Sequence, residues 1–281
     1  MILVKREKAL RDHLAAQRNK GITIGFVPTM GALHAGHLSL LEAARAQNGL
    51  VVCSIFVNPT QFNDPKDFQK YPITLEADIE QLEKAQADVL FLPYVEEVYP
   101  HGTAQLPLYN LGFLETVFEG AFRPGHFQGV CQVMDRLLSI VEPDDLFMGQ
   151  KDYQQCMVVS KLIALRSFKT TLHTCPTLRE PDGLAMSSRN MRLDAEARRK
   201  AVSISEALRQ LAGALQVGPV EPARAAAEQL LVSRGFKVDY IAVAAAGTLQ
   251  PVTEWDGKEQ LVLLAAAFLG EVRLIDNILV P

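Results

Sequence analysis

Two nearby histidines are the first side chains in this sequence that could do chemistry. His34 and His37 end the segment Pro28–His37, which follows an apolar run predicted as a strand, Ile22–Val27. Gly36 lets the main chain approach a ligand closely, and a helix beginning here would offer main-chain N–H groups to an anion. Imidazole N–H groups aimed at the charge that develops when a carboxylate attacks the α-phosphate of ATP would stabilise the transition state more than the ground state.

Other interpretations of the same segment stay open. His34 and His37 could belong to a structural turn, or could bind a metal ion together, although third and fourth zinc ligands do not stand nearby in the sequence. The segment is not a Walker A loop, because it lacks the closing Gly-Lys-Ser/Thr. It is not a dinucleotide-binding fingerprint either, because the spacing of Gly31 and Gly36 does not fit that pattern.

Two later segments carry groups suited to a polyphosphate. Lys151 stands in Gly149–Asp152, between a predicted strand at Asp144–Met148 and a predicted helix, so its ammonium would lie near a helix N-terminus. Met186–Arg189 supplies two hydroxyls and a guanidinium within one turn, which suits triphosphate oxygens. The structural alternatives are a solvated lysine in a helix cap, and a serine N-cap beside a surface arginine.

The order and length of these motifs resemble those of a known family. The likeness is to the pantothenate synthetases (pantoate–β-alanine ligases), within the nucleotidyltransferase superfamily shared with class I aminoacyl-tRNA synthetases, and it extends over essentially the whole chain. The segments that carry it are Pro28–His37, Phe56–Phe62, Arg123–Phe127, Lys151–Gln155 and Met186–Asn190.

The resemblance implies a two-step ligase on the way to coenzyme A. Pantoate and ATP would form pantoyl adenylate and pyrophosphate, and β-alanine would then attack the acyl carbon to give pantothenate and AMP. The expected partners are these small molecules, with Mg²⁺ accompanying the triphosphate and no residue assigned as a metal ligand. The same likeness implies a homodimer.

The resemblance also assigns roles to residues. The expected catalytic groups are His37, as a proton donor, His34 and Lys151. Gln61 and Gln155 are expected to hold pantoate, with Gln61 also near β-alanine, since a neutral amide can donate to pantoate without locking its carboxylate in an ion pair. The residues expected to contact ATP are Met30, Gly31, Ala32, Leu33, His34, Ala35, Gly36, His37, Gly149, Gln150, Lys151, Asp152, Leu178, Met186, Ser187, Ser188 and Arg189.

Some positions depart from the family's usual pattern. Gln150 stands where glutamate is common and Leu178 where valine is usual, which matters little if both positions contact ATP through the main chain. If the charge of the side chain at position 150 matters, the affinity for ATP or Mg²⁺ would differ from that of family members with glutamate there. Arg123, which precedes a proline, is a further candidate for the substrate or dimer region and is equally compatible with a surface loop.

Other functions remain as alternatives. A nucleotidyltransferase that joins a nucleotide to a phosphate ester could use the same histidine segment but would leave a dinucleotide product, and Gln61 and Gln155 favour the ligase. A non-catalytic nucleotide-binding module is disfavoured because both catalytic-type segments are complete. A tRNA synthetase is disfavoured because the sequence has no basic excess and no large added domain.

The composition is that of a folded chain. The 281 residues are 48% hydrophobic and 21% charged, which excludes wholesale disorder. The 28 basic and 32 acidic side chains give a net charge of −4, which argues against general nucleic-acid binding. The longest apolar run, Leu261–Gly270, is shorter than the ~20 residues of a membrane-spanning helix. The four scattered cysteines and the charged segment Met1–Lys8 favour a reduced, cytoplasmic protein.

The elements that must position these groups alternate along the chain. Strands and helices follow one another up to Cys175, and the strands are continuously apolar, which predicts a Rossmann-like, doubly wound parallel sheet. Two helices and three strands then predict a smaller α+β domain. The expected domains are 1–175, which binds ATP and pantoate, and 176–281, a lid over ATP.

The predicted boundaries are as follows. The expected helices are Leu3–Asn19, His37–Ala46, Leu75–Ala87, Gly129–Val141, Tyr153–Arg166, Asp194–Gln216 and Pro222–Arg234. The expected strands are Ile22–Val27, Leu50–Val57, Asp88–Pro93, Asp144–Met148, Thr170–Thr174, Val238–Val243, Gln260–Phe268 and Val272–Ile278. The stretch Tyr94–Gly125, with its glycines and prolines, is expected to be irregular.

Overall fold

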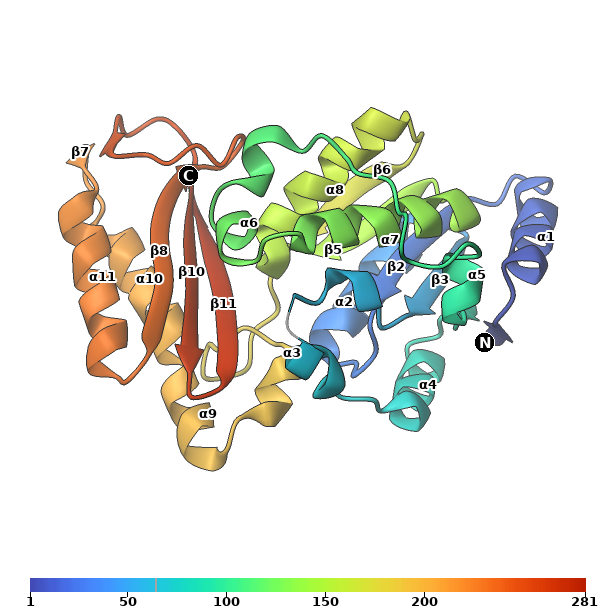
Figure 1. Ribbon diagram of the computed structural model, residues 1–281, viewed down its shortest axis with the longest axis horizontal. Helices are drawn as coiled ribbons and strands as arrows, with labels where there is room; N and C mark the ends of the chain where they lie inside the picture. The colour runs from blue at the N-terminus through green and yellow to red at the C-terminus, as the bar shows by residue number, and fades with distance from the viewer. Residues whose placement is uncertain (64) are drawn as a thin grey trace. The chain divides into compact units, whose positions relative to one another are not determined.

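The computed structural model describes residues 1–63 and 65–281, which form two compact units. The first unit is Met1–Gln150 with Gln154–Pro176, and the second is Lys151–Tyr153 with Thr177–Pro281. In Figure 1 the elements of the first unit run from blue to yellow-green, and those of the second from yellow to red. Each unit has its own sheet and its own core.

The first unit is built on a six-stranded, wholly parallel sheet with the strand order β1-β4-β3-β2-β5-β6. Its strands are β1 (Ile2–Val4), β2 (Ile24–Thr29), β3 (Leu50–Ile55), β4 (Val89–Phe91), β5 (Asp145–Gly149) and β6 (Thr171–Cys175). The chain moves outward from β2 through β3 and β4, then returns to the other side of β2 with β5 and β6. The order therefore reverses between β2 and β5, and in doubly wound sheets ligands bind beyond the carboxyl ends of the strands at such a point.

Helices cover both faces of this sheet (Figure 1). The helices of this part are α1 (Glu7–Arg18), α2 (Ala35–Gln47), η1 (Pro59–Gln61), α3 (Pro65–Gln69), α4 (Leu75–Lys84), α5 (Val95–Val98), η2 (Gly112–Glu115), α6 (Glu119–Phe122), α7 (His126–Val141) and α8 (Tyr153–Arg166). The turn η3 (Gln150–Asp152) leads from β5 into α8, and Lys151–Tyr153 of this stretch belong to the second unit. One core cluster joins α1, α7 and α8 to Phe26 of β2, and another joins α2 and α4 to Val27. Neighbouring strand residues point to opposite faces. The inner strands β2, β3 and β4 are therefore almost wholly buried, whereas the edge strands β1 and β6 are partly exposed.

The N-terminus corrects the prediction of a single helix over Leu3–Asn19. Leu3 lies in β1, opposite Leu90 of β4, and the helix begins at Glu7. Ile2–Val4 pair with Val89–Phe91 of β4, and Val4 is buried there. Glu7 then lies in the first helical turn, where an acidic side chain is favoured.

The stretch Tyr94–Gly125 contains short helical turns within otherwise irregular chain, namely α5, η2 and α6. Helix α7 starts at His126, earlier than the predicted Gly129. Gly125 takes a left-handed conformation with φ of 80°, which only glycine adopts at little cost, and so marks the helix start.

The second unit is an antiparallel three-stranded sheet, in the order β11-β10-β8, packed against helices. Its strands are β8 (Lys237–Ala245), β10 (Leu261–Leu269) and β11 (Val272–Val280), with β7 (Gly218–Pro219) and β9 (Glu254–Trp255) as a separate short pair. Its helices are η4 (Ser188–Arg192), α9 (Ala195–Ala201), α10 (Ser203–Ala214) and α11 (Glu221–Ser233). The predicted parallel sheet and the smaller α+β part are therefore both confirmed.

The predicted helix Asp194–Gln216 is in fact two helices, α9 and α10, which meet at Val202. The carbonyl of Val202 accepts the main-chain N–H groups of Ser205 and Glu206 and also the hydroxyl of Ser205. A serine hydroxyl that competes for a helix carbonyl tightens and bends the turn, and periodicity alone does not reveal this.

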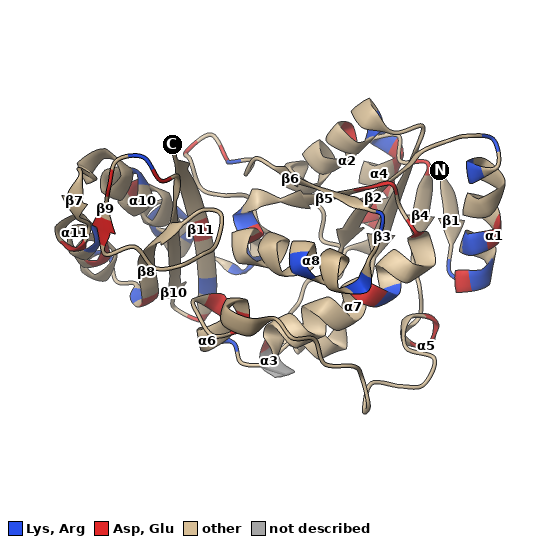
Figure 2. Ribbon diagram, turned by 90° about the horizontal axis from the view of Figure 1, so that it is seen from above, with Lys and Arg blue, Asp and Glu red and all other residues tan. Residues whose placement is uncertain are grey.

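Charged side chains on the outer helices are paired largely within their own helix. Figure 2 shows basic and acidic residues together on α1 and α11. On α1, Lys8 lies 2.6 Å from Asp12, and on α11, Arg224 pairs with both Glu221 and Glu228. Exposed pairs of this kind add little to stability. Within the part of the chain that the structure describes, no helix is long and apolar enough to cross a membrane.

Candidate active site

The order reversal in the parallel sheet brings the ends of three strands together. β2 ends at Thr29, which lies opposite Ile55 at the end of β3, and its other neighbour, β5, ends at Gly149. Because the strands are parallel, the segments Met30–His37 and Phe56–Gln61 leave the sheet at the same edge as Gly149. Three of the motifs found in the sequence therefore meet at one edge of the first unit.

His34 and His37 open helix α2 as a capping pair. His34 is the N-cap, and its Nδ1 accepts the N–H of Gly36 at 3.2 Å. His37 accepts the main-chain N–H of His34 on its own Nδ1 at 3.3 Å, and the two ring centroids are 4.0 Å apart. Because each Nδ1 accepts, each ring carries its proton on Nε2. The first turn of α2 thus holds two imidazole N–H donors at the helix end that favours anions.

A buried carboxylate holds the loop before this histidine pair. Asp78 of α4 is 1% exposed and accepts the main-chain N–H groups of Ala32 at 2.9 Å and Leu33 at 2.8 Å. Thr74 donates its hydroxyl to the same carboxylate at 3.1 Å. Ala32 has a φ of 48° and Gly31 a φ of 79°, a left-handed conformation that an alanine adopts only when its surroundings impose it. Asp78 therefore fixes the conformation of the segment that leads from β2 into α2.

The side chain of Gln61 is oriented by a chain of hydrogen bonds. Tyr99 Oη donates to Asn58 Oδ1 at 2.8 Å, and Asn58 Nδ2 donates to Gln61 Oε1 at 3.1 Å. The amide nitrogen of Gln61 then lies 3.2 Å from Met30 Sδ. Burial raises the pKa of Tyr99 to about 12, so the phenol remains a donor at neutral pH. Gln61 is thereby set to offer an N–H donor beside the histidine loop.

Arg123 supports the same turn from its other side. His126 Nδ1 lies 2.8 Å from the carbonyl of Gln61, so this nitrogen donates and Nε2 accepts from Arg123 Nη1 at 3.0 Å. Arg123 also lies 3.8 Å from Glu119, and its side chain is 19% exposed. It is therefore a partly buried member of a polar cluster behind Gln61, not an isolated surface arginine.

Gln155 and its neighbour Gln154 on α8 have different surroundings. Gln154 is 3% exposed, donates to the carbonyls of Leu114 and Val117, and accepts the N–H of Glu119. The side chain of Gln155 makes no hydrogen bond to any residue that the structure describes. Gln154 therefore supports the fold, whereas the amide of Gln155 can still donate hydrogen bonds to a ligand and accept them from it.

Lys151 lies in the 3₁₀ turn η3 that follows β5. Its side chain is 15% exposed, and its Nζ lies 3.8 Å from a carboxylate oxygen of Asp152. It is thus a largely buried cation rather than the solvated lysine of the alternative interpretation. Although it follows β5 and Gln150 directly in the sequence, Lys151 belongs to the second unit.

The segment Met186–Arg189 leads into the short helix η4 of the second unit. Ser187 is the N-cap of this helix, and its Oγ accepts the N–H of Arg189 at 3.3 Å, while its hydroxyl proton can still be donated. The carbonyl of Leu178 accepts the N–H of Met186 at 3.1 Å, and the Leu178 side chain is 40% exposed. This contact uses the main chain of Leu178, so it does not depend on which side chain stands at position 178.

Other reactive side chains do not add to the site. Burial raises the pKa of Cys53 and of Cys131 to about 12, so neither is a thiolate at neutral pH. Among residues 1–63 and 65–281, no three His, Cys, Asp or Glu side chains are grouped so as to hold a metal ion.

The structure brings together part of the predicted site and adds residues to it. Within the first unit it gathers the histidine loop, Gln61 and Gly149, whereas Lys151, Leu178 and Met186–Arg189 belong to the second. Sequence reasoning missed the supporting residues Asp78, Asn58 and Tyr99. Their only sequence signals are an acidic residue on the apolar face of a helix, for Asp78, and an asparagine before a proline at the start of a helical turn, for Asn58.

Comparison with known proteins gives matches over the whole chain. The family model for pantoate-beta-alanine ligase matches residues 2–279. The chain is 45% identical over 280 residues to the pantothenate synthetase of Phocaeicola vulgatus, covering 99% of each protein. It is 44% identical over 281 residues to that of Moorella thermoacetica, covering 99% of this chain and 98% of the relative.

Solved structures agree with these matches. A pantothenate synthetase from Thermus thermophilus superposes with a TM-score of 0.92 at 42% identity, over 99% of both chains. A pantoate-beta-alanine ligase from Francisella tularensis, complexed with beta-gamma ATP and beta-alanine, superposes with a TM-score of 0.82 at 39% identity. That match covers 99% of this chain and 97% of the other.

Proposed function

This chain belongs to the pantoate-beta-alanine ligase family, and we propose that the sheet edge at β2, β3 and β5 carries out the family's reaction. The reaction condenses pantoate with β-alanine at the expense of ATP and yields pantothenate, AMP and pyrophosphate, on the way to coenzyme A. The observation that carries the assignment of this edge is the pair of Nε2–H donors of His34 and His37 on the first turn of α2.

In the first step a carboxylate oxygen of pantoate attacks the α-phosphorus of ATP. A bond forms between that oxygen and phosphorus while the bond from phosphorus to the bridging oxygen breaks, and pyrophosphate leaves with the electron pair. Negative charge grows on the bridging oxygen and on the α-phosphate oxygens. The Nε2–H groups of His34 and His37 donate hydrogen bonds to these oxygens more strongly as the charge grows, which lowers the barrier. In this step His37 fills the donor role expected of it as a neutral hydrogen-bond donor that keeps its proton.

In the second step the amine nitrogen of β-alanine attacks the acyl carbon of pantoyl adenylate. A C–N bond forms, the C–O bond to AMP breaks, AMP leaves with the electron pair, and the amine nitrogen loses a proton to solvent. Activation as an adenylate is needed because a free carboxylate has no good leaving group.

Gln61 and Gln155 are the proposed pantoate-binding residues. The support for Gln61 is its amide orientation, in which Oε1 accepts from Asn58 and Nε2 lies beside Met30 of the histidine loop, with a second N–H to donate. A hydroxyl or carboxylate oxygen of pantoate is the kind of acceptor that this donor fits, and Gln61 also lies near β-alanine in this proposal. The support for Gln155 is an amide without a hydrogen-bond partner in the described chain.

ATP binding involves residues of both units in this proposal. Its contacts are Met30–His37, Gly149–Asp152, Leu178 and Met186–Arg189, with Lys151 as the cation that reaches the phosphates. Mg²⁺ enters bound to the triphosphate, which is how this ion commonly reaches nucleotide sites. The support is the likeness to a ligase complexed with beta-gamma ATP and the burial of Lys151 beside Asp152.

Three further parts of the proposal have separate support. The dimer rests on family likeness, the cytoplasmic location on the scattered cysteines, and the lid on the place of Met186–Arg189 near the expected domain boundary. We propose that the protein is a homodimer, that it acts in the cytoplasm, and that residues 176–281 form a lid domain over an ATP-binding domain of residues 1–175. Sedimentation velocity tests the dimer. Solution scattering with and without ATP and pantoate tests the lid, and identical profiles would contradict it.

The reaction is tested with purified protein, pantoate, β-alanine and MgATP. Pyrophosphate should appear with pantoate and MgATP alone, and AMP and pantothenate should accumulate once β-alanine is added. Omission of pantoate is the control and should abolish all three products. A dinucleotide product, or AMP release that does not depend on β-alanine, would contradict the ligase.

A further inference from the structure

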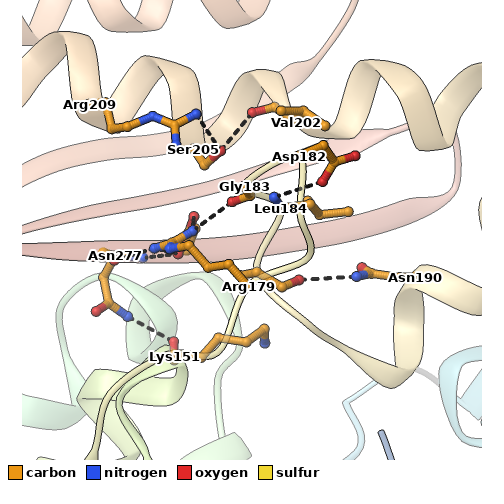
Figure 3. A network of polar contacts seen from close by, with 12 residues as sticks. Lys151, Arg179, Asp182, Gly183, Leu184, Asn190, Val202, Ser205, Arg209 and Asn277 are labelled. Carbon is orange, nitrogen blue, oxygen red and sulfur yellow. Dashed lines mark hydrogen bonds and ion pairs between the residues drawn. The ribbon is translucent and has the colours of Figure 1, made fainter. Parts of the chain in front are cut away.

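Strand β11 carries two adjacent buried polar residues. Asp276 and Asn277 are each 2% exposed, and the carboxylate-bearing side chain of Asp276 is fully buried. A carboxylate in such a place costs free energy unless it is paired and hydrogen-bonded, so its partners indicate what the arrangement does. Figure 3 shows these partners, which all belong to the second unit.

The carboxylate of Asp276 is matched by the guanidinium of Arg179. Arg179 Nη1 donates to Oδ2 at 2.7 Å and Nη2 donates to Oδ1 at 2.9 Å, and Oδ1 also accepts the main-chain N–H of Asn277 at 2.8 Å. The same guanidinium donates to the carbonyls of Gly183 at 3.1 Å and Asn277 at 3.2 Å. Arg179 is therefore fixed between β11 and the turn at Gly183.

Arg179 begins a hairpin that ends at the proposed ATP-binding segment Met186–Arg189. It lies opposite Ala185 in an antiparallel bridge, and the carbonyl of Leu178 accepts the N–H of Met186 at 3.1 Å. Fixing Arg179 therefore fixes the strand of the hairpin that runs directly into Met186–Arg189.

Asn277 reaches a different segment. Its Nδ2 donates to the main-chain carbonyl of Lys151 at 2.9 Å. Tyr153 adds a second attachment of this turn to the same unit, since its hydroxyl donates to the carbonyl of Ala246 at 2.8 Å. The main chain of the proposed phosphate-binding lysine is thus held by a side chain of β11.

We propose that Asp276 and Asn277 are positioning residues for ATP. Because neighbouring side chains of a strand point to opposite sides, β11 holds the hairpin before Met186–Arg189 through Asp276 and Arg179, and the carbonyl of Lys151 through Asn277. One strand thereby sets the spacing between two segments that bind the same triphosphate. This inference rests on the proposed function, in which both segments bind ATP.

The same sheet offers a matched control. Asp239 of β8 accepts from Arg273 of β11 at 2.7 Å, and their side chains are 12% and 16% exposed. This pair resembles Arg179 and Asp276 in chemistry, but its hydrogen bond joins β8 to β11 and involves neither Lys151 nor the hairpin. Loss of an ion pair in this sheet can therefore be separated from loss of the positioning contacts.

The test compares Asn277→Asp, Asp276→Asn and the control Asp239→Asn in steady-state kinetics, with melting followed by circular dichroism. Asn277→Asp replaces the donor to the Lys151 carbonyl by an acceptor. It should raise KM for MgATP about 10-fold or more, as should Asp276→Asn, with KM for pantoate and β-alanine changed by less than about twofold. The control should leave all KM values near those of the native chain. Mere loss of folded protein lowers the apparent kcat and leaves KM unchanged.

A second measurement keeps the test independent of folding yield and of the ligase activity. Calorimetry of MgATP binding, without pantoate, is made on Asn277→Asp, Lys151→Ala and the double variant. If Asn277 acts through Lys151, its loss of affinity should largely disappear in the Lys151→Ala background. Should Asp276→Asn fail to fold, Arg179→Lys carries the same prediction, because lysine keeps the charge but cannot make the two-pronged pair.

The outcomes separate this inference from the proposed function. An unchanged KM for MgATP in Asn277→Asp, or an equal loss of affinity with and without Lys151, overturns the positioning role while leaving the ligase intact. If the native protein forms no pantothenate, the ligase assignment fails. The calorimetric arm then still decides whether Asn277 positions an ATP site.

Discussion

His37 does two things that are separable at the level of single atoms. Its Nδ1 accepts the main-chain N–H of His34 and so closes the first turn of α2, while its Nε2–H is the donor proposed for adenylation. A glutamine at this helical position can make the same capping contact through its side-chain oxygen, whereas an alanine cannot. The structural and chemical contributions can therefore be measured apart.

We expect His37→Ala to lower the rate of pyrophosphate release from pantoate and MgATP by ~10²-fold or more, the usual scale for a lost charge-stabilising donor. His37→Gln should melt close to the native chain because the cap is kept, yet should also be slow because the imidazole is gone. His101→Ala, at an exposed histidine, is the control. An unchanged rate in His37→Ala would remove this residue from the mechanism.

The adjacent glutamines of α8 give a second residue-level prediction. Gln155→Ala should raise KM for pantoate several-fold and leave MgATP binding and the melting temperature nearly unchanged, because its amide has no partner in the described chain. Gln154→Ala should instead lower the melting temperature, since it leaves the carbonyls of Leu114 and Val117 without their donor. Steady-state kinetics and circular dichroism measure both, and equal losses for both substrates in Gln155→Ala count against its role.

At the scale of elements, the turn η1 that carries Gln61 is held by close packing against α7. A Cβ added to Gly129 would lie 2.2 Å from the carbonyl oxygen of Thr60 and 2.6 Å from the Cα of Gln61. These neighbours are main chain, so the helix and the turn would have to move apart. The absence of a side chain at Gly129 is what lets α7 fix the Gln61 turn.

Gly129→Ala should therefore raise KM for pantoate and destabilise the fold by ~1–3 kcal/mol, the usual cost of overpacking. The control is Gly213→Ala in α10, where a Cβ meets nothing within 4 Å and alanine should stabilise the helix by ~0.5–1 kcal/mol. Urea unfolding and substrate kinetics of the two variants give the comparison. If Gly129→Ala behaves like Gly213→Ala, α7 does not position the turn.

The sequence predicted most elements of the fold because the period of apolar residues depends on local chain geometry. It did not predict β1, since three residues are too few to show a period, nor the division of Asp194–Gln216, which depends on a serine hydroxyl. At the site, the motif segments could be found because they are contiguous. Asp78 could not, because its contact with Ala32 joins positions 46 residues apart and depends on the packing of α4.

At the scale of the whole molecule, the two units carry different titrating groups. All four cysteines lie in the first unit, and the single tryptophan, Trp255, lies in the second. Burial raises the pKa of Cys53, Cys131 and Tyr99, all in the first unit, to about 12. Thiol accessibility thus reports on the first unit and tryptophan fluorescence on the second.

These pKa values predict that the first unit loses stability as the solution becomes alkaline. Above the ordinary thiol pKa of 9.0, the unfolded chain releases protons that folded Cys53 and Cys131 keep until about pH 12. Their contribution is therefore fully present below pH 9 and is lost as the pH rises toward 12, at up to ~1.4 kcal/mol per pH unit for each thiol.

Urea titrations near pH 8 and about pH 10.5 follow the two reporters separately. The urea midpoint for pulse alkylation of the thiols should fall with pH more than the midpoint for Trp255 fluorescence, because no cysteine lies in the second unit. Cys53→Ala should reduce the pH dependence of the alkylation midpoint, since it removes one of the groups that hold a proton only when folded. Equal shifts of both midpoints would mean that the two units unfold as one, and an unshifted alkylation midpoint would mean that burial does not hold these thiols protonated.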